Sequence, residues 1–271
     1  MGALIVFSHA NSFPASTYAV LFRSLRSRGF QVRALEKLGH DPAYPVTSNW
    51  PHLVRQLNDF AEDAVRGHTG PLYYVGHSLG GFLSLMTACR HPQPAGRPID
   101  GVLLLDSPVV SGWRAAALRL AKSTGAVGAL GPGSVSRRRR QHWDSRAAAR
   151  AHFAGKPLFA AWEPAVLDDY LEHGLRDTEG GGCTLAFDRA VETAIYNTLP
   201  HNLDRLLRRH PPPCPVAFIG GTRSGELRQA GLAMTQRVTQ GRVSMLEGSH
   251  LFPMEKPLET AAAIEAALRP F

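Results

Sequence analysis

Residues Leu72-Tyr73-Tyr74-Val75-Gly76-His77-Ser78-Leu79-Gly80 join an apolar run to a helical pattern through a G-x-S-x-G turn. The run Leu72–Val75 is typical of a buried strand, and Leu79–Arg90 favours a helix. A serine on such a tight turn is strained, and small neighbours relieve the crowding around it. Its hydroxyl stands clear of the sheet, beside N–H groups that can stabilise an oxyanion. We therefore interpret Ser78 as a nucleophile, with a chance match at a structural turn as the alternative.

The alternation of strand and helix extends over most of the chain. Continuous apolar runs are typical of parallel strands that are covered on both faces. Five further runs are expected to be strands: Ala3–Phe7, Phe30–Ala34, Gly101–Leu105, Val216–Ile219 and Arg242–Leu246. Further helices are expected at Ser16–Arg28, Trp50–Arg66, Glu226–Thr239 and Leu258–Leu268. The sequence therefore predicts an α/β fold, with a mostly parallel sheet and flanking helices.

This alternation is interrupted between Val109 and Pro200, where helical patches and glycine-rich turns occur without a clear strand. The segment Arg208–Pro215 then reads as a stiff proline linker that leads into the next strand. We therefore predict a core domain of residues 1–108 and 201–271. A helical cap of residues 109–200 is expected to be inserted after the strand that ends near Asp106.

A histidine near the C-terminus is the expected partner of Ser78. His250 follows the last predicted strand behind a Gly-Ser turn. A loop at this edge of the sheet can bring a general base to the serine hydroxyl. The chain has 12 histidines, and most are expected at the surface or satisfied in the core. His250 differs because it follows both the nucleophile and the final strand.

The segment Ser8-His9-Ala10-Asn11 follows the first predicted strand, and its loop is expected to face Ser78. The backbone N–H of Ala10 or Asn11 is expected to pair with that of Leu79 as an oxyanion hole. His9 is expected to fix the loop. The Asn11 side chain is expected either to touch substrate or to cap the turn.

Taken together, these motifs resemble those of the α/β-hydrolase fold superfamily over nearly the whole chain. The resemblance rests on the His9-Ala10 loop, the Ser78 turn, the helical cap and the late His250. It implies the fold and a Ser-His-acid triad mechanism. It also implies an aspartate after the Val216–Ile219 strand, where this chain has Ser224 instead.

Two carboxylates are candidates for the missing acid. Asp106 ends the Gly101–Leu105 strand, and some members of the fold carry their acid at that topological position. Glu226 lies a few residues past the usual place, where support of a helix N-terminus is the competing interpretation. We favour Asp106 and keep Glu226 as the alternative, because the acid only orients and supports the histidine.

The leading functional hypothesis is a serine hydrolase that cleaves a carboxylic ester of a small or medium acyl group through an acyl-enzyme. The alternatives are a C–C hydrolase, a lyase or a cofactor-free haloperoxidase on the same fold. A non-catalytic ligand-binding module is a further alternative, since the usual aspartate is missing. No cofactor is expected, and no His/Cys/Asp cluster has the spacing of a metal site. The three cysteines are too scattered for a disulfide framework.

The formal net charge is +8, and its distribution is uneven. Ten basic residues and one acidic residue lie between Ser111 and Lys156, whereas two basic and eight acidic residues lie between Pro157 and Pro200. This polarity favours steering of an anionic small-molecule substrate, or docking of the two halves on each other. Nucleic acid is not expected as a partner, because the run Arg137–Arg140 has no interleaved aromatics and reads as a solvated loop.

Membrane association is not expected either. No apolar run approaches the ~18 residues that a membrane-spanning helix needs. The N-terminal residues lack a basic region and a cleavage site, so they do not read as a signal peptide. The expected location is the cytoplasm, and the oligomeric state is left open.

Overall fold

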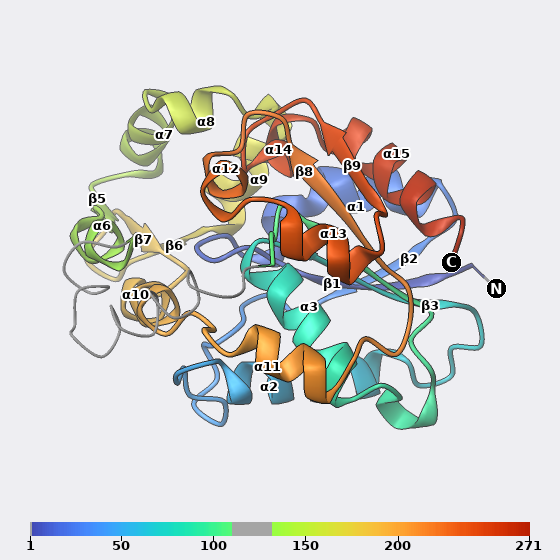
Figure 1. The fold of residues 1–271 in the computed structure, drawn as a ribbon. Coiled ribbons are helices and arrows are strands. Elements are labelled where there is room, and N and C mark those ends of the chain that lie inside the picture. The colour runs from blue at the N-terminus through green and yellow to red at the C-terminus, as the bar shows by residue number, and fades with distance from the viewer. Residues whose placement is uncertain (1, 110–131) are drawn as a thin grey trace.

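The computed structural model describes residues 2–109 and 132–271. Its core is a six-stranded sheet in which every pairing is parallel. The strands are β1 (Leu4–Ser8), β2 (Gln31–Ala34), β3 (Leu72–His77), β4 (Gly101–Leu105), β8 (Val216–Gly221) and β9 (Val243–Leu246). They lie in the order β2-β1-β3-β4-β8-β9, with helices on both faces (Figure 1). The predicted α/β sheet is confirmed, and no strand end differs by more than two residues from its prediction.

Neighbouring residues along the strands point into two different apolar clusters. Phe7 packs with helices α1 (Ala19–Ser27) and α15 (Pro257–Leu268) on one face of the sheet. Val6 packs with helices α2 (Pro51–Ala64) and α3 (Leu79–Arg90) on the other face. Both faces are thus buried, which explains why these strands read as continuous apolar runs.

The strand register aligns the ends from which the site is built. Ser8 pairs with Gly76, and His77 pairs with Leu105. Because the strands are parallel, the loops after β1, β3 and β4 all open at one edge of the sheet. Figure 1 shows the inserted helices gathered beyond this edge on the left, and both termini at the right.

The segment predicted as one helix over Glu226–Thr239 forms two helices. These are α12 (Gly225–Ala230) and α13 (Ala233–Thr239), with α11 (Leu203–Arg209) and α14 (Phe252–Glu255) completing the helices of this half. Gly231 separates α12 from α13 with a φ of +72°, a left-handed conformation that glycine adopts readily. At its other end, α12 begins beside the end of β4, where the Ser224 hydroxyl contacts Asp106.

Within the predicted cap, the structure describes residues 132–200, and residues 110–131 lie outside the described ranges. The helices here are α6 (Pro132–Arg138), α7 (Arg146–Ala154), α8 (Pro157–Ala160), α9 (Pro164–His173) and α10 (Arg189–Asn197). The prediction of no strand is wrong, because β5 (His142–Trp143), β6 (Leu175–Asp177) and β7 (Cys183–Leu185) form an antiparallel sheet in the order β5-β7-β6. Strands this short cannot show an alternating pattern in the sequence.

Candidate active site

Ser78 stands between β3 and α3 with a φ of +53°, where a non-glycine residue is strained. Its neighbours have no room for a side chain. A Cβ on Gly76 would lie 2.2 Å from the backbone of Gly80, and a Cβ on Gly80 would lie 1.9 Å from the carbonyl oxygen of Ser8. The G-x-S-x-G pattern therefore occurs here because only glycine lets the chain turn this tightly beside β1.

The structure joins the three predicted residues in one hydrogen-bonded chain. The Ser78 hydroxyl donates to Nε2 of His250 at 2.9 Å. Nδ1–H of His250 donates to Oδ2 of Asp106 at 2.6 Å, because a carboxylate can only accept. Asp106 follows β4 directly, and His250 lies in the loop between β9 and α14. Each residue thus sits just beyond the carboxyl end of a strand.

Three donors hold the buried Asp106 carboxylate. Besides His250, the backbone N–H of Gly221 donates to Oδ1 at 2.8 Å and the Ser224 hydroxyl donates to Oδ2 at 2.5 Å. Ser224 is the residue that stands where the family resemblance implies an aspartate. Its oxygen also accepts the N–H of Leu227 at 3.0 Å and caps α12. Ser224 therefore binds the carboxylate of Asp106 instead of supplying a carboxylate itself.

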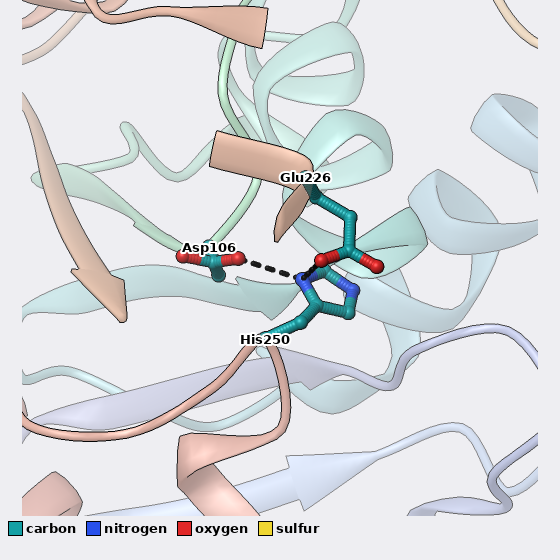
Figure 2. Close-up of side chains that lie close together, drawn as sticks. All are labelled: Asp106, Glu226 and His250. Carbon is teal, nitrogen blue, oxygen red and sulfur yellow. Dashed lines mark hydrogen bonds and ion pairs between the residues drawn. The ribbon is translucent and has the colours of Figure 1, made fainter. Parts of the chain in front are cut away.

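Glu226 lies near the same ring nitrogen but farther away. Its Oε2 is 3.9 Å from Nδ1 of His250, and its side chain is 57% exposed. Asp106 is fully buried at 2.6 Å from the same atom. Figure 2 shows the two carboxylates on either side of the imidazole, one from the end of β4 and one from α12. Nδ1 has a single proton to donate, so the geometry favours the buried Asp106 over Glu226.

The sequence shows no cluster with the spacing of a metal site, but among the described residues the fold brings one such group together: Asp106, Glu226 and His250. Their potential ligand atoms all lie within 4.8 Å of one another. Here the Asp106 oxygens and Nδ1 of His250 are already hydrogen-bonded to each other and to the loop after β8. A metal ion at this place would compete with the bond that orients the histidine.

Hydrogen bonds of the loop after β1 leave fewer N–H groups available for the predicted oxyanion hole. The N–H of Ala10 donates to Oη of Tyr18 at 3.0 Å, so the part of the prediction that offered Ala10 as a donor needs correction. Among the described residues, the N–H groups of Asn11 and Leu79 have no hydrogen-bond acceptor. The Asn11 side chain donates to the carbonyl oxygen of Glu192 at 3.1 Å and so ties this loop to α10.

A buried relay that the sequence did not reveal connects this loop with the loop of His250. The Tyr18 hydroxyl donates to Nδ1 of His77 at 2.7 Å, and Nε2–H of His77 donates to the carbonyl oxygen of His250 at 2.8 Å. Burial lowers the pKa of His77 to about 3, so the ring stays neutral. In the sequence, the one sign that His77 lies at the site is its place inside the G-x-S-x-G pattern.

His9 fixes its loop, as predicted. Nδ1–H of His9 donates to the carbonyl oxygen of Ala10 at 2.8 Å, and Nε2 accepts the N–H of Leu38 at 2.8 Å. The ring is fully buried, which lowers its pKa to about 4. Both ring nitrogens are thereby occupied, and His9 is not free to act as a base.

A pocket of about 990 Å³ opens onto Ser78 and His250. The core contributes residues of the β1 and β9 loops, and the inserted segment contributes most of the opposite wall. The side chains on that wall are Val135, Ser136, Arg138, Arg139, Arg140, His152, Lys156, Leu158, Phe159, Glu192 and Tyr196. Substrate at Ser78 would therefore lie between the sheet edge and residues 132–200.

The model of the α/β hydrolase family matches residues 5–263. The chain belongs to this family. Human monoglyceride lipase is 29% identical over 111 residues, which are 39% of this chain and 37% of the lipase, so the match spans little more than a third of that relative.

Solved structures place this family member among known hydrolase folds. E-2-(acetamidomethylene)succinate hydrolase has a TM-score of 0.71 at 21% identity, with 99% of this chain and 92% of that chain covered. The thioesterase domain from the curacin biosynthetic pathway also has a TM-score of 0.71, at 17% identity, with 97% and 91% covered. At such identities the likeness concerns the fold.

The charge distribution of this α/β hydrolase has a structural basis. Three ion pairs join the basic half of the inserted segment to its acidic half: Arg139–Glu192 at 3.1 Å, Arg146–Asp177 at 2.8 Å and Arg150–Asp168 at 2.6 Å. Docking of the halves is therefore observed. The prediction of a solvated loop over Arg137–Arg140 is wrong in two ways. Arg137 and Arg138 end helix α6, and the Arg139 side chain is 16% exposed and also donates to Oη of Tyr170 at 2.7 Å.

The described part of the chain contains no helix long and apolar enough to cross a membrane.

Proposed function

We propose that the protein is a serine hydrolase that cleaves carboxylic esters of small or medium acyl groups through an acyl-enzyme. The observation that carries this proposal is the chain Ser78–His250–Asp106, with hydrogen bonds of 2.9 and 2.6 Å. These distances are within the reach that proton transfer from a nucleophile to its base requires. Family membership supports the same reading of the site.

In the acylation step, Oγ of Ser78 attacks the ester carbonyl carbon while its proton passes to Nε2 of His250. The carbonyl oxygen becomes an oxyanion, for which the N–H groups of Leu79 and Asn11 are the proposed donors. His250 then gives the proton to the alkoxide oxygen as the C–O bond breaks. The alcohol leaves, and the acyl group stays on Ser78.

Deacylation repeats these steps with water as the nucleophile. His250 takes one proton from water, the hydroxide attacks the acyl carbon, and the proton returns to Oγ of Ser78 as the acid is released. Asp106 remains ionised throughout and keeps Nδ1 of His250 protonated. No cofactor takes part in this sequence.

The other chemistries of the fold use similar constellations, and none is favoured by a specific contact here. A module that only binds ligand has no need of the hydrogen-bonded chain between Ser78, His250 and Asp106, so its intact geometry supports an enzyme.

Turnover of p-nitrophenyl esters of graded acyl length tests the proposal. Ser78→Ala is expected to abolish turnover because the nucleophile is gone. Ser84→Ala is the matched control, since Ser84 is buried in helix α3, which follows Ser78, and its hydroxyl has no partner among the described residues. Circular dichroism checks that both variants are folded. Equal turnover by Ser78→Ala and the unaltered protein would contradict the proposal.

A further inference from the structure

The pocket wall that faces Ser78 carries more positive than negative charge. Its basic side chains are Arg138, Arg139, Arg140 and Lys156, and its carboxylate is Glu192, while Glu226 lines the pocket from α12 beside His250. The carboxylates and the cations differ in whether they have ion-pair partners inside the protein.

Glu192 is already satisfied. Arg139 pairs with its Oε2 at 3.1 Å, and the Ser12 hydroxyl donates to its Oε1 at 2.6 Å. Glu226 is more than half exposed and lies beside His250. Glu192 is therefore not free to balance the remaining cations of the wall, and among the described residues Glu226 has no ion pair with any of them.

Three of these cations have no carboxylate partner. Within residues 2–109 and 132–271, no Asp or Glu oxygen lies within 4 Å of the charged nitrogens of Arg138, Arg140 or Lys156. The residues between these ranges, 110–131, contain no Asp or Glu in their sequence. The described part of the pocket wall therefore carries positive charge that no carboxylate pairs.

What these cations do contact holds them in place without cancelling their charge. The guanidinium of Arg140 donates to the carbonyl oxygen of His142 at 2.8 Å and lies 5.6 Å from the centre of the Trp143 ring. The ammonium of Lys156 lies 5.7 Å from the centre of the Phe153 ring. Such contacts orient a cation without neutralising it, and both residues line the pocket.

The neighbouring charges repel one another. Burial and the nearby Arg139 lower the pKa of Lys156. Burial together with Lys156, Arg140 and Arg139 lowers the pKa of His152, whose Nε2 is buried without a hydrogen-bond partner among the described residues. An anion in the pocket would relieve this repulsion and supply acceptors for these donors.

We propose that Lys156, together with Arg138 and Arg140 of the same pocket wall, binds an anionic group on the substrate at the end remote from the ester carbonyl. This inference rests on the proposed function, because it assigns the substrate class of the same pocket. A carboxylate and a phosphate or phosphonate share the chemistry that this cluster recognises. The expected substrates are thus esters whose acyl chain ends in such a group.

The experiment measures one selectivity ratio, kcat/KM for an anionic ester divided by kcat/KM for its neutral counterpart. The anionic probes are mono-p-nitrophenyl esters of adipic, suberic and sebacic acid, and the neutral ones are the same esters with a methyl-capped end. Corresponding esters with an ω-phosphonate distinguish the two anion sources. Three chain lengths allow the anionic group to reach the cluster from Ser78.

In the unaltered protein the ratio is expected to exceed one for at least one chain length. Lys156→Met is expected to lower it about tenfold, since a hydrogen bond to a charged group contributes about 1.5–3 kcal/mol. Raising NaCl from about 50 to about 500 mM is expected to lower it too, because salt screens these charges. Arg150→Met is the matched control: it removes one positive charge from the inserted segment outside the pocket, and the ratio is expected to stay the same.

A ratio near one at every chain length, or an equal fall in Lys156→Met and Arg150→Met, would overturn the inference while leaving the proposed ester hydrolysis intact. Absence of all turnover would instead remove the proposed function. In that case calorimetric titration still decides the anion site. Adipate and suberate are expected to bind more tightly than their dimethyl esters and to lose affinity in Lys156→Met, and equal binding would overturn it.

Discussion

The edge of the parallel sheet and the inserted segment differ in whether their charged side chains have partners inside the protein. At the sheet edge, Asp106 is fully buried and three donors from His250, Gly221 and Ser224 satisfy its carboxylate. In the inserted segment, Arg139 is paired inside the protein, whereas Lys156 has no carboxylate partner among the described residues. The backbone of the sheet thus fixes the arrangement for the chemistry, and the inserted segment leaves charge available for what enters the pocket.

The largest effect is expected at the buried end of the sheet edge. Asp106→Asn removes the charge that holds the histidine in its tautomer, and kcat for ester hydrolysis is expected to fall about 10⁴-fold. Glu226→Gln is the matched test of the alternative acid, and its kcat is expected to fall less than about tenfold because the carboxylate is exposed and distant. The reverse order of the two variants would assign the acid to Glu226.

The inserted segment offers a comparison of an inner and an outer ion pair. Arg139→Met leaves Glu192, 5% exposed, without its cation, and the free energy of unfolding is expected to fall by about 3–5 kcal/mol. Arg150→Met breaks a pair whose side chains are more than half exposed, with an expected loss of about 0–1 kcal/mol. Urea unfolding measures both. Similar losses would mean that Arg139 does not hold the two halves together.

Stability is expected to depend on pH through the two buried histidines of the sheet edge. The pKa values of His77 and His9 are lowered to about 3 and about 4 in the folded protein, whereas the unfolded chain has ordinary values. Below about pH 6.5 the unfolded state therefore binds more protons, and stability is lost as the pH falls. Each group contributes about 1.4 kcal/mol per pH unit in this range.

Unfolding by urea at pH 7, 6 and 5 measures this slope. The slope reports how many more protons the unfolded state binds than the folded state. His9→Asn is expected to lower this number by about one, since one titrating group is gone. A slope that stays the same in this variant, or stability that does not change between these pH values, would show that the rings are not held neutral.

The smallest effect is expected at Ser224. Ser224→Ala removes one of the donors to Asp106, and kcat is expected to fall about tenfold while KM stays the same, as for a residue that positions the acid. The lost helix cap is expected to lower the free energy of unfolding by about 1 kcal/mol. A change in KM alone would place Ser224 in substrate binding instead.

The sheet edge was predictable from the sequence because its residues follow strands directly. Ser78, Asp106 and His250 each come just after an apolar run, and parallel strands bring such ends together. The contacts of Ser224 with Asp106 and of Tyr18 with Ala10 were not predictable, since they join residues that have no local pattern in common. The sequence therefore predicts Ala10 as an oxyanion donor, although its N–H is donated to Tyr18.

In the inserted segment, composition predicted the helices and the polarity of charge, but not their arrangement. The sequence of an arginine run does not indicate which guanidinium is buried. Arg139 is the one that pairs with Glu192, a residue far along the chain. The strands β5, β6 and β7 are too short to show a period.

The central claim, that Ser78 is the nucleophile of a serine hydrolase, is tested most directly by covalent labelling with a fluorophosphonate. Intact-mass spectrometry is expected to show one phosphonyl group per chain, peptide mapping is expected to place it on Ser78, and Ser78→Ala and His250→Ala are expected to remain unlabelled. Labelling on another residue, or none in the folded unaltered protein, would contradict the account.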